Sequence, residues 1–209
     1  KSRQFTSEFI QKHNILADLM AAVKWDRDAD KIIYDPELYN EQTNTWVREV
    51  KAPFKPEPSM QEAYKVFSKM IVVNKAKDTG MVTLSVEHLS PKVAQQWVTW
   101  LIQDINKVMK ERDVAEAHRS TEFLNQQIAL TNVADIKTVL YKLIEEQAKT
   151  IMFAEVRDEY VFKTIDPALA PEEKAKPKRA LICVLGTMLG GMLGVMLVLV
   201  RHFMRKEQN

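Results

Sequence analysis

The stretch that decides the fold runs from residue 90 to residue 156 and reads SPKVAQQWVTWLIQDINKVMKERDVAEAHRSTEFLNQQIALTNVADIKTVLYKLIEEQAKTIMFAEV. It opens with Ser90-Pro91, a typical helix start, because serine caps free N–H groups and proline fits the first helical position. Neither proline nor glycine occurs again before Pro167. A single helix over residues 91–129 would be about 58 Å long at a rise of about 1.5 Å per residue.

The two halves of this predicted helix differ in apolar content. From Val93 to Met109 a broad apolar face suits packing on a sheet, whereas charged residues dominate beyond Lys110 and leave little apolar surface to bury within one chain. A new cap at Thr131-Asn132 and a helical stripe from Ile136 to Met152 predict a second helix that returns beside the first. The sequence therefore predicts a long helical hairpin, over about residues 91–156, that projects from the body of the protein.

A projecting hairpin needs neighbours, because helices gain most of their stability by packing an apolar face. We therefore expect the chain to form a homo-oligomer through this hairpin. The candidate oligomer contacts are apolar residues of its charged half, Val114, Phe123 and Leu124.

The segments before residue 70 predict the helical part of the body. Apolar residues at mostly helical spacing predict a helix between Ser2 and Met20. Residues 25–46 are less regular and are interpreted as a loop with short helical turns. After a proline-rich connector, Ser59 and Glu62 have the spacing of a capping box, which predicts the start of another helix.

The strands of the body are predicted after this helix. Residues 71–75 and 81–87 flank a turn and alternate in polarity, which predicts a strand pair with one face buried. Residues 160–165 form a third β-rich stretch, whose partner strands would have to be distant in the sequence. These elements predict an α/β base that carries the hairpin.

A different kind of sequence follows near the carboxyl terminus. Residues 180–200 are 21 consecutive residues without a charge, enough for about 31 Å of helix, and we expect them to form a transmembrane helix. The fold class is therefore an α+β membrane protein with an α/β base, a projecting helical hairpin and a C-terminal transmembrane helix. Small residues one turn apart let membrane helices approach closely, and the candidates for such packing are Gly186, Gly190, Gly191 and Gly194.

The charges argue against a nucleic-acid partner. The last 30 residues hold three of the 30 basic residues and one of the 28 acidic residues, which leaves 27 of each in residues 1–179. A neutral soluble region without a basic stripe does not fit nucleic-acid binding.

The sequence has no motif of catalysis or metal binding. The four histidines are scattered, and no Walker-type loop, His-Glu-x-x-His or Gly-x-Ser-x-Gly occurs. Trp97 and Trp100 could form a sugar-stacking platform, but their spacing fits a core residue and its neighbour more simply. We therefore predict a protein that is not an enzyme and needs neither a cofactor nor a metal.

The sequence resembles the Wzz-type polysaccharide co-polymerases, the family of O-antigen chain length determinants. The similarity lies mainly in a proline-rich segment that leads into the last helix, with Pro167, Pro171 and then Pro177-Lys178, followed at the family spacing by Gly190-Gly191-Met192. Weaker similarity extends over nearly all of the chain, for example at Ser90-Pro91.

The resemblance implies an architecture and a location. Residues 1–166 would form a periplasmic domain, 167–179 a proline-rich segment beside the membrane, 180–200 a helix in the bacterial inner membrane and 201–209 a cytoplasmic tail. A first transmembrane helix would precede residue 1, and ring-like homo-oligomers would form. The family's main domain lies in the periplasm.

The resemblance also implies a function, namely non-enzymatic control of the O-antigen chain length of lipopolysaccharide. The implied partners are other copies of the chain, the O-antigen polymerase, membrane lipid and the polysaccharide itself. Alternatives are a regulator of another surface polysaccharide, such as enterobacterial common antigen or capsule, a membrane-anchored helical sensor, and an enzyme with an unrecognised site.

Overall fold

The computed structural model describes residues 2–172 and 179–206, with side chains for residues 2–172 and 182–197. It divides into two compact units, Lys1–Ala170 and Pro171–Asn209. Helices α1–α5 and strands β1–β6 belong to the first unit, and helix α6 belongs to the second.

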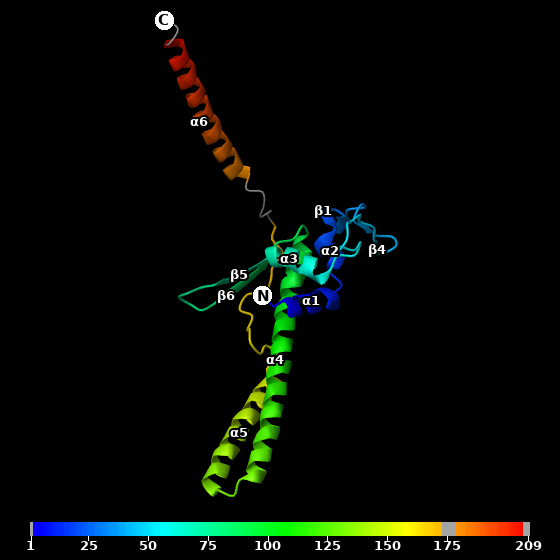
Figure 1. Cartoon of the computed structure of the whole chain (residues 1–209), viewed down its shortest axis with the longest axis vertical. Coiled ribbons are helices and arrows are strands. Elements are labelled where there is room, and N and C mark those ends of the chain that lie inside the picture. Colours follow the sequence, from blue (N-terminus) through cyan, green and yellow to red (C-terminus); the bar gives the residue numbers. More distant parts are fainter. Residues whose placement is uncertain (1, 173–178, 207–209) are drawn as a thin grey trace. The chain divides into compact units, whose positions relative to one another are not determined.

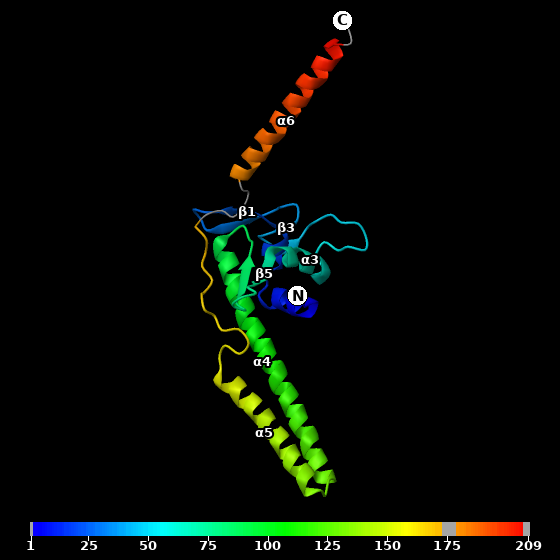
Figure 2. The same ribbon diagram turned by 90° about the vertical axis from the view of Figure 1, so that its left-hand side faces the viewer.

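The predicted long hairpin is confirmed as the main feature of the first unit. Helix α4 (Pro91–Leu130) has 40 residues and is therefore about 60 Å long. Ser90 caps it by accepting a hydrogen bond from the Val93 N–H. Helix α5 (Ala134–Val156) returns beside the far half of α4, as Figures 1 and 2 show. Half of α4 thus lies in the body and half in the hairpin.

The hydrophobic core surrounds the first turns of α4. Helices α1 (Arg3–Lys12), α2 (Leu16–Met20) and α3 (Met60–Met70) pack there around Trp97, Phe9 and Phe67, which are almost fully buried. The rings of Phe67 and Trp97 are 5.8 Å apart, a favourable distance for an aromatic pair. The core therefore fixes α4 at its amino-terminal half.

The predicted helix between Ser2 and Met20 is interrupted. The chain leaves α1 at Lys12 and enters α2 at Leu16. Between them Asn14 has a φ of 50°, a left-handed conformation that asparagine tolerates better than most residues.

The interpretation of residues 25–46 as a loop with helical turns is wrong. Two antiparallel hairpins occupy this region, β1 (Ala22–Asp26) with β2 (Lys31–Tyr34) and β3 (Tyr39–Asn40) with β4 (Thr45–Trp46). Asp30 and Asn44 adopt positive φ angles in the two turns. These residues replace the glycine that usually signals such a hairpin.

The predicted strand pair is confirmed as β5 (Ile71–Lys75) and β6 (Val82–Val86). Gly80 provides the positive φ that the turn needs. The apolar face is covered only at one end, where Leu84 and Val86 pack against the core. Val82 at the other end is exposed, and so is Val73, the partner of Leu84 on β5. The prediction of one buried face therefore holds only in part.

The predicted third strand at residues 160–165 is wrong. This segment is irregular and belongs to a strap, residues 157–170, that lies along α4 (Figure 1). Each sheet among the described residues has two strands. The base is therefore a mixed body of helices and two-stranded hairpins, as predicted in its mixed character.

Helix α6 (Arg179–Lys206) forms the second unit. Among the residues that the structure describes, no helix is long and apolar enough to cross a membrane. The span over residues 180–200 stays a prediction from the sequence. Pro177 and Lys178 lie outside the described residues.

Arg48 holds the proline-rich connector against α3. Its guanidinium donates to both carboxylate oxygens of Glu62, at 2.9 and 3.1 Å, and to the carbonyl oxygens of Lys55 and Pro56. Glu62 also accepts from the Ser59 N–H at 3.0 Å, while the Ser59 hydroxyl accepts from the Glu62 N–H. The predicted capping box is therefore confirmed, and Arg48 extends it.

We expect Arg48→Ala to lower the free energy of unfolding by about 2–3 kcal/mol at neutral pH, because a largely buried carboxylate and two carbonyl groups lose their donor. The hydrogen bonds from Arg48, together with those at Ser59, lower the pKa of Glu62 from 4.5 to about 2. The stabilisation is therefore complete above pH 4.5 and is lost as the pH falls toward 2. Urea unfolding followed by tryptophan fluorescence, at pH 7 and at pH 3, measures both effects.

The matched control is Arg112→Ala, which removes an exposed arginine from α4. It should leave the free energy of unfolding and its pH dependence unchanged. An Arg48→Ala variant as stable as the wild type at pH 7 would contradict this account of the connector.

Candidate functional site: the helical hairpin and the groove beside α4

The two helices of the hairpin meet along a seam of regularly spaced residues. Ala117 and Ala154 are buried, and half-buried residues recur from them at intervals of three and four along the far half of α4 and along α5. This spacing is that of antiparallel helices packed as in a coiled coil. The seam consists of Val114, Ala117, Thr121, Leu124 and Ile128 on α4, and of Lys137, Leu140, Ile144, Gln147, Ile151 and Ala154 on α5.

The seam explains where the predicted oligomer contacts lie. Val114 and Leu124 are half-buried in the seam, so α5 of the same chain covers much of each side chain. Phe123 is 59% exposed. Of the three candidates, Phe123 is therefore the one that is well placed to contact another molecule.

Phe123 belongs to a larger exposed surface near the tip of the hairpin. Four of its members precede a seam position by one residue, and Leu130 precedes half-buried Thr131, where the same spacing continues past the end of α4. In an antiparallel pair such positions of both helices point to the same side. Their exposed fractions range from 45% for Leu143 to 78% for Leu130. This surface, called the distal apolar face below, consists of Phe123, Leu130, Ile136, Val139 and Leu143.

The strap is fastened to α4 by two side-chain amides. Asn106, only 5% exposed, accepts hydrogen bonds from the N–H groups of Val161 and Phe162 at 2.9 and 2.8 Å and donates to the Phe162 carbonyl oxygen. Gln95 donates to the carbonyl oxygen of Ala168 at 2.7 Å. The backbone groups of Val161 and Phe162 thus bond to a side chain and not to a neighbouring strand.

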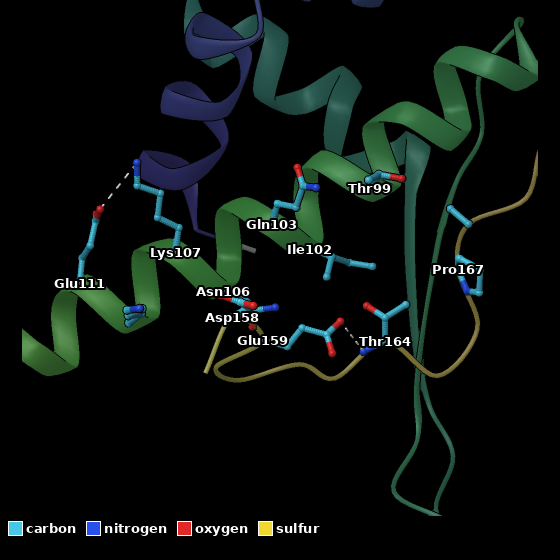
Figure 3. Close-up of a pocket in the computed structure, with 12 residues that line it drawn as sticks. Thr99, Ile102, Gln103, Asn106, Lys107, Glu111, Asp158, Glu159, Thr164 and Pro167 are labelled. Carbon is cyan, nitrogen blue, oxygen red and sulfur yellow. Dashed lines mark hydrogen bonds and ion pairs between the residues drawn. The ribbon is translucent and has the colours of Figure 1, made fainter. Parts of the chain in front are cut away.

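A groove of about 580 Å³ lies between α4 and the strap. Figure 3 shows Ile102 projecting from α4 toward Glu159 and Thr164, which belong to the strap. Glu159 accepts a hydrogen bond from the Thr164 N–H at 3.0 Å, and the hydrogen bonding to Thr164 lowers the pKa of this carboxyl group. The lining residues are Thr99, Ile102, Gln103, Asn106, Lys107, Lys110, Glu111, Asp158, Glu159, Thr164, Pro167 and Ala168.

The structure places the predicted signature prolines and glycines as follows. Pro167 lines the groove, and Pro171 is the first residue of the second unit. The four glycines Gly186, Gly190, Gly191 and Gly194 lie on α6, and apart from the nearby backbone of α6 itself no described atom would lie within 4 Å of a Cβ added to any of them. Their role in helix packing stays a prediction.

The two tryptophans of α4 do not form an open platform. Trp97 is buried in the core, and Trp100 stacks on His13, with ring centroids 4.1 Å apart and planes 12° apart. His13 and Lys12 both bind the nearly buried carboxylate of Asp104. Burial raises the pKa of Asp104, but the hydrogen bonds from Lys12 and His13 outweigh it and hold the pKa below its usual value. This cluster joins α1 to α4.

Among the residues that the structure describes, no group of three or more histidine, cysteine, aspartate or glutamate side chains could hold a metal ion.

The comparison with protein families points to polysaccharide production. Residues 124–203, which include the end of α4, all of α5, the strap and most of α6, match the family model GNVR, described as "G-rich domain on putative tyrosine kinase". The model is associated with polysaccharide co-polymerases, so the match points to a protein connected with polysaccharide chain length or export. No curated protein matches the chain.

We expect Asn106→Ala to loosen the strap, because the N–H groups of Val161 and Phe162 lose their acceptor. Hydrogen exchange at these two amides should become at least tenfold faster, while exchange in the core around Trp97 changes little. Mass spectrometry of peptides from residues 157–170 measures the effect. Gln126→Ala, an exposed position on α4, is the matched control, and equal exchange in both variants would show that Asn106 does not hold the strap.

Proposed function

We propose that the chain is a non-enzymatic regulator of O-antigen chain length that acts as an oligomeric scaffold in the bacterial inner membrane. Three observations support the proposal. The family match connects the chain with polysaccharide chain length or export. The sequence resembles the Wzz-type proteins from Pro167 to Gly194. The hairpin also carries an apolar surface that its own chain does not cover.

The distal apolar face is the observation that carries the oligomeric part of the proposal. Five large apolar side chains lie exposed on one side of a two-helix hairpin, and clusters of this kind mark interaction surfaces on proteins. The other apolar side of each helix already packs against its partner in the seam. Because hydrophobic burial is the main favourable term in association, contact with the hairpin of another copy would stabilise this surface.

The membrane part of the proposal rests on the sequence of α6. Residues 180–200 carry no charge, and we propose that they cross the inner membrane, with residues 1–166 in the periplasm and 201–209 in the cytoplasm. Gly186, Gly190 and Gly194 would then allow close packing with other copies or with the O-antigen polymerase. A scaffold of this kind would act on the polymerase and contact the growing polysaccharide and the membrane lipid.

The function is tested on the length distribution of lipopolysaccharide, separated on a gel. Deletion of the gene should replace a modal distribution of O-antigen lengths with a broad one, and the wild-type chain should restore the mode. The double variant Ile136→Glu with Leu143→Glu should shift or broaden the distribution, because charges on the distal apolar face oppose its burial in a neighbour. Synthesis of O-antigen itself should continue.

The matched control is Thr138→Glu with Tyr141→Glu. Both residues are exposed and each follows a seam position by one residue, so they lie on the opposite side of the hairpin. This variant should restore the normal distribution. An unchanged distribution after deletion would contradict the proposed function, and a change confined to another surface polysaccharide would assign the regulator to that pathway.

A further inference from the structure

The groove between α4 and the strap contains polar groups that the protein itself does not use. Within the described part of the chain, the amide of Gln103, the ammonium group of Lys110 and the carboxylate of Asp158 have no hydrogen-bonding or ion-pair partner. Glu159 adds a carboxylate to the same lining, which accepts a hydrogen bond from the Thr164 N–H. Donors and acceptors thus converge on one hollow.

The charges of the groove disfavour an anionic ligand. Its lining has three carboxylates, Glu111, Asp158 and Glu159, against the two ammonium groups of Lys107 and Lys110. The ammonium group of Lys107 already forms an ion pair with Glu111, at 3.7 Å, as Figure 3 shows at one end of the groove. A phosphate or pyrophosphate would meet more negative than positive charge, whereas a ligand without net charge pays no such penalty.

The walls of the groove add apolar surface between the polar groups. Ile102, Pro167 and Ala168 contribute it from α4 and from the strap. A volume of about 580 Å³ lies in the range of about 300–1,000 Å³ that is usual for sites of small ligands. A neutral molecule with many hydroxyl groups and apolar C–H faces fits this combination, because each hydroxyl both donates and accepts a hydrogen bond.

We propose that this groove binds a short, uncharged saccharide segment of the polysaccharide whose length the protein controls. The inference rests on the proposed function, because that function brings the protein to a growing glycan. Gln103, Lys110, Asp158 and Glu159 bind the sugar hydroxyls, and Ile102 and Pro167 contact the C–H faces of the rings.

Ligand binding in the groove also affects the strap. The strap forms one wall and continues from Pro167 to the boundary of the first unit at Ala170. A bound saccharide bridges α4 and the strap, and therefore stabilises their attachment beyond the bonds of Asn106 and Gln95. Occupancy of the groove thus protects residues 157–170 from hydrogen exchange.

The experiment uses the full chain in detergent micelles. The probe is the surface polysaccharide of the source strain, released from lipid by mild acid and cut to fragments of one or two repeat units. Saturation-transfer difference NMR should detect binding of the fragments to the wild-type chain, and hydrogen exchange in residues 157–170 should slow in their presence. Inorganic pyrophosphate at equal concentration should neither bind nor compete.

The double variant Gln103→Ala with Asp158→Ala should bind the fragments at least tenfold more weakly, since it removes one neutral and one charged hydrogen-bonding group. The matched control, Glu122→Ala with Gln126→Ala, removes the same two kinds of group from exposed positions of α4 outside the groove and should bind as the wild type does. Circular dichroism melting establishes that both variants are folded.

Two results would overturn the inference. One is the absence of fragment binding to the folded wild-type chain, and the other is equal binding by the groove variant and its control. Displacement of the fragments by pyrophosphate would also contradict the inference, because it would show that the groove binds an anion. Because the gel assay of chain length is independent of these measurements, a chain that controls length without binding fragments would refute the saccharide site and leave the proposed function intact.

Discussion

The uninterrupted backbone of α4 is the constraint on which the rest of the first unit depends. No glycine or proline occurs within its 40 residues after Pro91, so every turn keeps its hydrogen bonds. Its near half is fixed by Trp97 and the surrounding helices, while its far half has α5 as its packing partner. One helix therefore connects the core, the strap and the hairpin.

The two-helix hairpin cannot bury all of its apolar residues. A pair of helices has one mutual interface, and here Ala117 and Ala154 are buried in it and allow close approach. Apolar residues one position before the seam, such as Phe123 and Ile136, are left on the outer surface. An isolated hairpin would keep this surface in water at a cost of about 25 cal/mol per Å² of apolar area. Burial by other copies removes that cost, which links the geometry of the hairpin to the proposed scaffold.

Caps and turns were predicted correctly where they depend on residues that are close in the sequence. The cap at Ser90, the capping box of Ser59 and Glu62, and the hairpin around Gly80 are all present, because each depends on residues close in sequence. The turns at Asp30 and Asn44 were missed, since these residues adopt positive φ without the usual glycine signal. Val114 and Leu124 lie half-buried in the seam, and their role as oligomer contacts stays a prediction, because an apolar stripe does not tell whether its partner is the same chain or another.

The groove and the strap could not be found by such signals. Asn106 bonds to Val161 and Phe162, which are more than 50 residues away, and no pattern in the sequence indicates that an amide side chain takes the place of a neighbouring strand. The alternation of residues 160–165 therefore predicted a strand that does not form. The lining of the groove likewise combines two segments that are distant in the sequence.

The central claim is that other copies of the chain cover the distal apolar face in the cell. The most direct measurement is the rate at which a maleimide reagent labels single cysteines in intact membranes, in a chain with Cys183→Ala. Ile136→Cys lies on the face, and Tyr141→Cys lies on the opposite side of the same helix. Coverage predicts labelling of Ile136→Cys at least tenfold slower than that of Tyr141→Cys, with the difference abolished in detergent that separates the copies. Equal labelling rates in the membrane would contradict the account.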